Sequence, residues 1–320
     1  MLCLIKMDQR RRAFLKGVVV IIAGAAALLV LSLLALYVWL ERSLKPQPST
    51  RAFWNLSSMP LAKRLEGYFY AARPDIYLKP ATWDWFLKYI NKNETGDKYH
   101  GKVITMTDAH QIVSLNTPVE ITDLEHVIPY PVARSIILQH PLPSIAVMNC
   151  ACRAQKQDAC EPRDVCLVVG EPFASFVLEH HPHQARRLTV DEALSILQAE
   201  EERGHIHTAW FKDVMHDRFY TICNCCTCCC LGMASYNRGV ARMAHSGYKP
   251  VVDQDTCSVC GVCAQTCPFQ AIEIGEEHAL INLDRCMGCG LCASHCVCSA
   301  ISLRLAPEKG VPLDIKTLLA

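Results

Sequence analysis

Two stretches near the C-terminal end of the chain decide its fold: Cys257-Ser-Val-Cys260-Gly-Val-Cys263-Ala-Gln-Thr-Cys267-Pro268 and Cys286-Met-Gly-Cys289-Gly-Leu-Cys292-Ala-Ser-His-Cys296. Each stretch spaces four cysteines with gaps of two, two and three residues, and the second begins about 29 residues after the first. A short apolar run follows each stretch, at residues 271–274 and 300–303. The region is therefore an internal repeat of a cysteine-rich loop and an apolar run.

The spacing of these cysteines predicts two iron–sulfur clusters. Two-residue gaps form a tight loop around one cubane, and Gly261, Gly288 and Gly290 let the backbone approach its sulfides. The fourth cysteine of each copy, set off by three residues, reaches the cluster of the other copy. Zinc is the alternative, but it fits this doubled pattern poorly. The predicted ligands of the first [4Fe-4S] cluster are Cys257, Cys260, Cys263 and Cys296, and those of the second are Cys286, Cys289, Cys292 and Cys267.

The second copy departs from the first just after its fourth cysteine. Cys296 is followed by Val297 and Cys298, where the first copy has Pro268 and a phenylalanine. We expect the changed turn to leave Cys296 in place as a ligand and Cys298 to be a spare, buried thiol. The alternative, in which Cys298 replaces Cys296, would lengthen the spacing.

The cysteine content of the whole chain points to metal. The chain holds 20 cysteines in 320 residues, and all except Cys3 lie between Cys150 and Cys298. Disulfide frameworks spread their cysteines, whereas metal sites bunch them, because one ion or cluster collects several thiolates. The formal net charge is +1, so nothing in the composition suggests a nucleic-acid-binding surface.

A second set of cysteines lies in the middle of the chain. They follow or flank short apolar runs at residues 145–148, 167–169 and 219–222, which we read as strands. Within the densest part, Cys223/Cys226 and Cys226/Cys229 have the C-x-x-C spacing that wraps a metal or a cluster. A third iron–sulfur cluster, a structural zinc, and disulfides or free redox thiols remain alternatives; no C-x-x-C-H occurs, which excludes c-type haem. The candidate ligands are Cys150, Cys152, Cys160, Cys166, Cys223, Cys225, Cys226, Cys228, Cys229 and Cys230.

A helix is predicted between these cysteines. Thr189 and Glu192 form a capping box at its start, and Gly204 suits the position after its end. His205 and His207 follow directly. They are either metal ligands or, as is more common for such residues, partly exposed strand positions.

The N-terminal segment predicts a membrane anchor. Residues 17–40 carry no charged side chain, and at about 1.5 Å each they span roughly 36 Å, enough to cross a bilayer core. The excess of positive charge before this segment places the N-terminus in the cytoplasm and the body of the protein on the periplasmic or extracytoplasmic side. The run from Arg11 to Lys16, R-R-A-F-L-K, also resembles a twin-arginine export signal; the alternative is that these charges only orient the anchor.

Residues 251–305 resemble bacterial 2[4Fe-4S] ferredoxins and the ferredoxin-type domains of larger redox proteins. The central region is similar to a poorly characterised family of 4Fe-4S binding proteins that place a Cys-rich module ahead of a ferredoxin domain. The residues that carry this second resemblance are Cys150, Cys152, Arg153, Cys160, Cys166, Gly204, His207 and the run from Cys223. The resemblance implies iron–sulfur clusters and no known substrate.

The expected fold is α+β: an N-terminal transmembrane helix, a Cys-rich α+β middle domain and a C-terminal bacterial dicluster ferredoxin-like domain. The expected parts are a basic cytoplasmic segment (1–16), a transmembrane anchor (17–40), a linker (41–50), the Cys-rich domain (51–247), two 4Fe-4S ferredoxin-type repeats (248–277 and 278–306) and a C-terminal tail (307–320).

The expected function is electron transfer at a membrane through two [4Fe-4S] clusters, and a third iron–sulfur cluster or a zinc ion is the candidate occupant of the middle domain. The first alternative is a reductase whose Cys-rich middle domain is the active site, fed by the ferredoxin domain. The second is a sensor or assembly factor that uses its thiols to detect metal or oxidation. Six carboxylates against two arginines in residues 251–305 favour a redox partner with a basic docking face.

Overall fold

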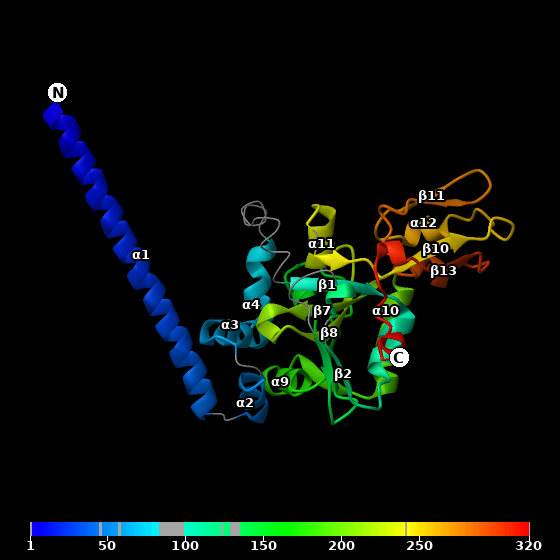
Figure 1. Cartoon of the computed structure of the whole chain (residues 1–320), viewed down its shortest axis with the longest axis horizontal. Helices are drawn as coiled ribbons and strands as arrows, with labels where there is room; N and C mark the ends of the chain where they lie inside the picture. The colour runs from blue at the N-terminus through cyan, green and yellow to red at the C-terminus, as the bar shows by residue number, and fades with distance from the viewer. Residues whose placement is uncertain are drawn as a thin grey trace. The chain divides into compact units, whose positions relative to one another are not determined.

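The computed structural model describes residues 2–44, 47–56, 59–82, 99–122, 124–128, 135–240 and 242–319, with side chains of the first helix described over residues 17–39. The chain divides into two compact units, Met1–Arg51 and Ala52–Ala320. The first unit is dominated by α1 (Leu2–Leu44), and α2 (Pro48–Trp54) begins at its end (Figure 1). Over Gly17–Trp39, α1 is long and apolar enough to cross a membrane, and its large apolar side chains are exposed. A signal sequence has the same composition.

The second unit is built around a nine-stranded mixed sheet, in which six strands and a short edge strand run in the order β6-β4-β5-β8-β7-β1-β9. The antiparallel pair of β2 and β3 joins this sheet where β3 meets β8. The bounds of these strands are β1 (Tyr99–Ile104), β2 (Val119–Thr122), β3 (Ser135–Leu138), β4 (Ile145–Asn149), β5 (Asp164–Val169), β6 (Ala185–Leu188), β7 (Ile206–Lys212), β8 (Arg218–Cys225) and β9 (Met243–Ala244).

Helices cover both faces of the sheet. The α-helices are α3 (Leu61–Ala72), α4 (Pro74–Leu78), α7 (Met106–Val113), α8 (Ala151–Ala154), α9 (Phe173–His180), α10 (Val190–Glu202), α11 (Leu231–Asn237), α12 (Val262–Thr266), α13 (Leu291–Ser294) and α14 (Ile315–Leu318). The short 3-10 helices are η1 (Lys79–Thr82), η2 (Leu124–His126), η3 (Asp213–Met215) and η4 (Pro307–Lys309). The predicted capping box is present at the start of α10, and Gly204 follows its end with φ +76°.

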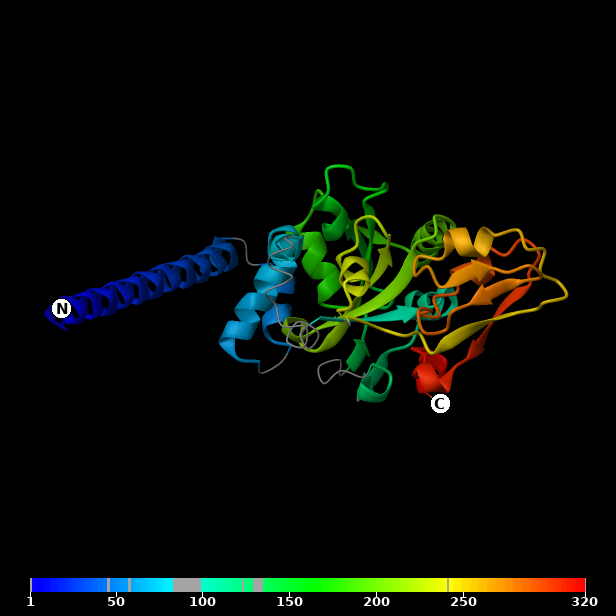
Figure 2. The same cartoon turned by 90° about the horizontal axis from the view of Figure 1, so that it is seen from above.

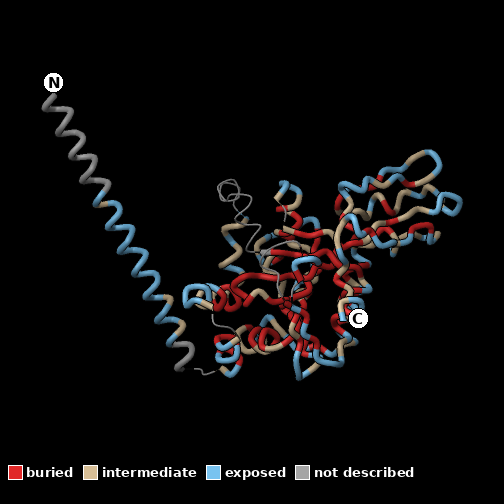
Figure 3. The backbone as a smooth tube through the Cα atoms, viewed as in Figure 1, coloured by how far each residue is buried: buried red, intermediate tan, exposed pale blue. Residues whose placement is uncertain are grey.

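The main apolar core lies on the face of the sheet that α7, α10 and α14 cover. Strand side chains alternate between faces, so a row across β4, β5, β8 and β7 points to one side. Val147, Leu167, Ile222 and Ala209 form such a row in direct register, and all four are fully buried. Most of the sheet is buried (Figure 3, red). The same core includes Leu313 and Ile315, so residues of the expected C-terminal tail pack into the middle domain.

The C-terminal part is a small domain of two successive strand–helix–strand repeats (Figure 2, yellow to orange). Its strands are β10 (Tyr248–Val252), β11 (Ile272–Ile274), β12 (Ala279–Ile281) and β13 (Ile301–Leu305). They form two antiparallel pairs, β10 with β13 and β11 with β12, so the first strand of each repeat pairs with the second strand of the other repeat. Each repeat thus places one short helix, α12 or α13, between its two strands. The overall α+β class is confirmed.

Candidate metal centres

The two cysteine loops of the dicluster domain have the same backbone conformation. Val259 and Gly288, at equivalent positions of the two repeats, have φ +55° and +68°. Gly261 and Gly290 have φ +79° and +94° and lead into α12 and α13. These left-handed residues curl each loop, and the N–H of Gly288 donates to the Cys286 sulfur at 3.4 Å, a contact that favours a thiolate ligand.

Backbone N–H groups also reach the fourth cysteine of each repeat. The N–H of Ala271 donates to the Cys267 sulfur at 3.4 Å, and the N–H of Ala300 donates to the Cys296 sulfur at 3.3 Å. Hydrogen bonds of this kind favour the thiolate over the thiol. The same hydrogen bond occurs at equivalent positions of the two repeats. Both fourth cysteines are therefore favoured in the thiolate form that binds metal.

The fourth cysteine of each repeat lies with the first three of the other repeat. Cys267 lines a cavity together with the three loop cysteines of the second repeat and apolar side chains such as Ile272 and Leu291. In that cavity, burial and the charges of Cys286 and Cys267 raise the pKa of Cys292 to about 12. Buried thiols of this kind ionise only when a cation compensates them, and the four-sulfur cavity fits a cluster.

In the first predicted ligand set, the fourth cysteine likewise comes from the other repeat. Burial raises the pKa of Cys263, and the charges of Cys260 and Cys296 add to that rise. Cys263 also packs in one small core with Cys257 and Cys296. The structure therefore brings the two predicted ligand sets together, while their ligation of iron stays a prediction.

Cys298 differs from the expectation of a buried thiol, because it is only half-buried. Its sulfur lies 3.7 Å from the Cys296 sulfur and accepts a hydrogen bond from the Ser258 hydroxyl at 3.7 Å. The changed turn after Cys296 thus places Cys298 at the edge of the first ligand set and leaves Cys296 inside it.

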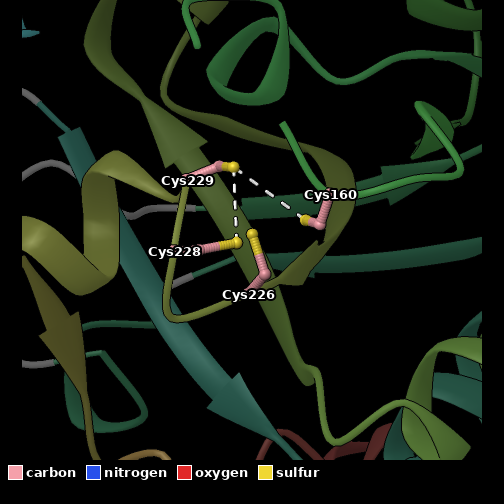
Figure 4. A group of neighbouring side chains, drawn as sticks. All are labelled: Cys160, Cys226, Cys228 and Cys229. Carbon is pink, nitrogen blue, oxygen red and sulfur yellow. Dashed lines mark hydrogen bonds between the residues drawn. The ribbon is translucent and has the colours of Figure 1, made fainter. Parts of the chain in front are cut away.

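The ten middle-domain cysteines fall into two groups. The first, which we call the four-thiol group, consists of Cys160, Cys226, Cys228 and Cys229, whose sulfurs all lie within 4.8 Å of one another (Figure 4). The Cys229 sulfur is 3.9 Å from that of Cys160 and 3.4 Å from that of Cys228. Although burial opposes ionisation, hydrogen bonds from neighbouring thiols and the charge of Arg153 lower the pKa of Cys226 to about 7.

The sulfur spacing of the four-thiol group suits a single tetrahedral ion. With metal–sulfur bonds of about 2.3 Å, the sulfurs around one zinc or iron ion lie about 3.8 Å apart. In a cubane, each thiolate binds a different iron atom, so the sulfurs lie farther apart. Among the residues that the structure describes, neither dicluster ligand set draws three thiols as close together as the four-thiol group. The donor set therefore fits one thiophilic ion better than a third cubane.

The other six cysteines form the second group, which we call the thiol ring. Cys166 on β5 faces Cys223 on β8 across the sheet, with 3.9 Å between their sulfurs. Cys230 donates to the Cys225 sulfur at 3.0 Å. The other members of the thiol ring are Cys150 and Cys152, at the start of α8.

Of the two C-x-x-C pairs identified in the sequence, one lies within a single group of thiols and the other does not. Cys226 and Cys229 lie together in the four-thiol group, as the spacing suggests. Cys223 and Cys226 do not share a site, because Cys223 belongs to the ring and contacts Cys166. The physical reason is that Cys223 still lies within β8, where residues two apart share a face, and the chain leaves the strand only after Cys225.

A buried arginine lies beside both groups. Arg153 is fully buried and pairs with the equally buried Glu200 at 2.6 Å. It also donates to the carbonyl oxygens of Pro162 and Asn224. Its charge acts on thiols of the four-thiol group and on Cys166 of the ring. Arg153 can therefore offset part of the negative charge that metal-bound thiolates bring into the protein.

An apolar pocket of about 80 Å³ opens onto the thiol ring. Its floor includes Cys150, Cys152, Cys166 and Cys223, and its walls carry aromatic side chains such as Phe176 of α9. Pockets with apolar walls and a few reactive groups at one end are typical of small-molecule sites.

A second cavity, polar and of about 730 Å³, lies between the four-thiol group and the dicluster domain. Cys226 and Cys228 line one side, and Cys267 and His295 line the other. The interface around it includes a 5.2 Å ring contact between Tyr236 of α11 and Phe269. The second predicted cluster site thus lies close to the four-thiol group.

Among the described residues, neither histidine after α10 joins the four-thiol group. His205 donates from Nδ1 to the Glu200 carboxylate at 2.7 Å. His207 is buried on β7, with Nδ1 2.7 Å from the Asn224 side-chain oxygen. The expectation of partly exposed strand positions is wrong for His207, because β7 is an interior strand of the sheet with every residue buried.

Comparison with known proteins agrees with the dicluster geometry. Residues 249–297 match the family of 4Fe-4S dicluster domains. No curated protein matches the chain. The match confirms the ferredoxin type of this segment, which is an iron–sulfur-binding domain.

Proposed function

We propose that the chain is a membrane-anchored iron–sulfur protein that transfers electrons through two [4Fe-4S] clusters. This proposal rests on Cys267 lining one cavity with the three loop cysteines of the second repeat, and on Cys296 packing in one small core with Cys257 and Cys263. Such clusters, when bound, accept and release one electron at a time. The chain supplies the thiolates, the N–H donors to sulfur and the apolar walls that set their potential.

The polar cavity supports a route between the dicluster domain and the middle domain. The segment that carries Cys267 faces the segment that carries Cys226 and Cys228 across this cavity. We infer that the four-thiol group holds a third metal, as a single ion bound by four thiolates. An iron ion there would extend the electron path, whereas zinc would be structural.

The N-terminal helix would tether this assembly to a membrane. Its apolar length over Gly17–Trp39 supports a single span. Lysine and arginine residues precede the span, which supports a cytoplasmic N-terminus and a body on the periplasmic or extracytoplasmic side. The R-R-A-F-L-K run from Arg11 supports export of the folded protein by a twin-arginine route.

The electron-transfer partner would be a redox protein with a basic docking face. The dicluster domain carries more carboxylates than basic residues, and bound clusters with thiolate ligands add negative charge. A complementary positive face on the partner would speed encounter at low ionic strength.

A second candidate function, a reductase with its active site in the Cys-rich domain, is supported by the apolar pocket. Four thiols of the ring meet aromatic walls there, which is an arrangement suited to a small apolar substrate. The dicluster domain would then deliver electrons to that pocket rather than to another protein.

The proposed function is tested by redox titration of the anaerobically purified full chain, followed by EPR. Two reduced [4Fe-4S] centres are expected, each accepting one electron. Cys257→Ser should remove one centre and Cys286→Ser the other. A titration without low-temperature cluster signals, in folded protein, would refute electron transfer through these sites.

A further inference from the structure

Two thiols on adjacent strands lie at the floor of the apolar pocket. Leu167 of β5 and Ile222 of β8 are paired in antiparallel register, so the residues next to them, Cys166 and Cys223, oppose each other across the two strands. Their sulfurs lie 3.9 Å apart. Both side chains are half-buried and line the pocket, whose walls are apolar and aromatic. The pocket therefore gives a small molecule access to a pair of neighbouring thiols.

These two thiols are too few for a metal site. A tetrahedral ion held by the protein takes three or four ligand atoms, with sulfurs about 3.8 Å apart. Among the residues that the structure describes, the four-thiol group is the only set of three or more cysteine, histidine or carboxylate ligand atoms within 4.8 Å of one another. Cys166 and Cys223 lie outside that set. Two opposed thiols are, however, the number that disulfide chemistry requires.

We propose that Cys166 and Cys223 are a redox-active pair that cycles between a dithiol and a disulfide at the floor of the pocket. On oxidation two S–H bonds break, one S–S bond forms, two protons pass to water and two electrons leave, one to each of the two oxidised [4Fe-4S] clusters. On reduction the disulfide takes one electron from each cluster and two protons from water. The pair rests on the proposed function only for this exchange of electrons.

The backbone geometry suits a bridge between the two strands. Opposed residues of antiparallel strands have Cα atoms about 4.5–5.5 Å apart, within the range of about 4.4–6.8 Å found in disulfides. Rotation of the Cys166 and Cys223 side chains can therefore bring the sulfurs from 3.9 Å to a bond length of about 2.05 Å while the strands stay in place. Because β5 and β8 are interior strands of the sheet, the two thiols stay opposed in both oxidation states.

A second close pair of thiols lacks this access to the pocket. The Cys225 and Cys230 sulfurs are 3.0 Å apart, but both residues are buried and neither is among those that line the pocket. Cys225 lies two residues after Cys223 on β8 and therefore shares its face of the strand. Cys225 is thus a matched control for Cys223.

The test is a map of disulfides in the full chain, purified without oxygen in detergent and equilibrated with dithiothreitol and glutathione redox buffers. Free thiols are trapped with N-ethylmaleimide in acid, and tryptic peptides are analysed by mass spectrometry. Cys166 is the only cysteine in peptide 164–186, so its partner can be assigned. We expect this peptide to become linked to peptide 219–238 in a two-electron Nernst step and to be released on reduction. Cys223→Ser should abolish the link, and Cys225→Ser should keep it.

The exchange of electrons with the clusters is tested on the oxidised chain. Reduced methyl viologen, a one-electron donor, should open the link at least about tenfold faster in the unmodified chain than in Cys257→Ser/Cys286→Ser, which lacks a ligand of each cluster. Equal rates would overturn the clusters as the source of electrons.

Three outcomes would overturn the redox pair itself. These are Cys166 and Cys223 that stay reduced across both buffers, a link that persists in Cys223→Ser, and loss of metal from folded Cys166→Ser/Cys223→Ser, which would make the two thiols ligands. Fragmentation of the linked peptides identifies the bridged cysteines in the unmodified chain, so the map decides even if a variant does not fold. Because the buffers act on the pair directly, a link in a chain without cluster signals would refute the proposed electron transfer and leave the pair standing.

Discussion

Arg153 and Glu200 form an ion pair at 2.6 Å in which neither side chain is exposed to solvent. Arg153 follows Cys152 of the thiol ring, and Glu200 lies near the end of α10, where it also accepts from His205. Burial opposes the charged form of Glu200, yet the hydrogen bonds from His205 and Arg153 lower the pKa of its carboxyl group. The pair therefore joins α8, α10 and the end of β8 beside both thiol groups.

Removal of Arg153 should destabilise the protein strongly. Arg153→Ala leaves the buried Glu200 carboxylate with only His205 and the partly exposed Arg203 as charged partners, which should cost up to about 3–5 kcal/mol of unfolding free energy. Arg163→Ala is a matched control, because its ion pair with Glu161 is exposed and should contribute at most about 1 kcal/mol. Chemical denaturation under argon measures both. Similar losses in the two variants would show that the buried pair has no special role.

Gly288 should tolerate no side chain. A Cβ atom there would overlap the carbonyl oxygen of Tyr248 and the hydroxyl of Ser246, and φ is +68°. Gly288→Ala should therefore displace the loop that carries Cys286 and Cys289, with loss of about half the cubane iron. Gly239→Ala is the control, since φ is +71° there but no atom lies within 4 Å of the added Cβ. That variant should keep its iron and lose only about 1 kcal/mol. Full iron content in Gly288→Ala would contradict this account of the loop.

Cys296, not Cys298, should be the ligand of the first cluster. Cys296 accepts the backbone N–H of Ala300 and lies among the loop cysteines of the first repeat, whereas Cys298 lies at the edge of that set. Cys298→Ser should therefore leave both EPR signals unchanged, and Cys296→Ser should abolish one. The reverse result would make Cys298 the ligand.

Acid should destabilise the middle domain through its buried histidines. Burial lowers the pKa of His207 to about 4, against an ordinary value near 6.5. As pH falls, His207 of the unfolded chain binds a proton before His207 of the folded protein does. The stability that the neutral, buried His207 provides is therefore full above about pH 6.5 and is lost progressively towards pH 4. His216 and His245 shift in the same direction. His207→Gln should make the fall in stability shallower by up to about 1.4 kcal/mol per pH unit. An unchanged pH profile in this variant would exclude His207 as a contributor.

The twin-arginine interpretation makes a separate prediction. Arg11→Lys/Arg12→Lys keeps the positive charge before the span, so an anchor oriented by charge alone should insert as before. Export through a twin-arginine pathway should be blocked, and the body should stay accessible to cytoplasmic labelling reagents. Unchanged export in the variant would favour the charge-only alternative.

The dicluster domain is well predicted from sequence because residues close together in the chain determine its structure. Spacing within residues 257–296 defines both loops, and the equivalent left-handed positions at Gly261 and Gly290 follow from it. The capping box at Thr189 is local too, and α10 begins there as predicted. The Cys-rich domain depends on contacts distant in sequence, such as Cys160 with Cys229, which no local spacing reveals.

In the Cys-rich domain, the alternation of side chains along one strand predicts which thiols lie together. The alternation of Thr221, Cys223 and Cys225 along a strand places all three on one face. The C-x-x-C spacing of Cys223 and Cys226 competes with this alternation and fails, because the strand continues through Cys225. The buried pair of Arg153 and Glu200 joins residues far apart in the chain, and nothing in its local sequence marks it.

Iron and acid-labile sulfide, counted per chain in anaerobically purified full-length protein, test the central claim most directly. Two cubanes in the dicluster domain predict about eight sulfides and at least about eight irons, with brown colour that dithionite bleaches. Folded, active protein without labile sulfide would contradict the account.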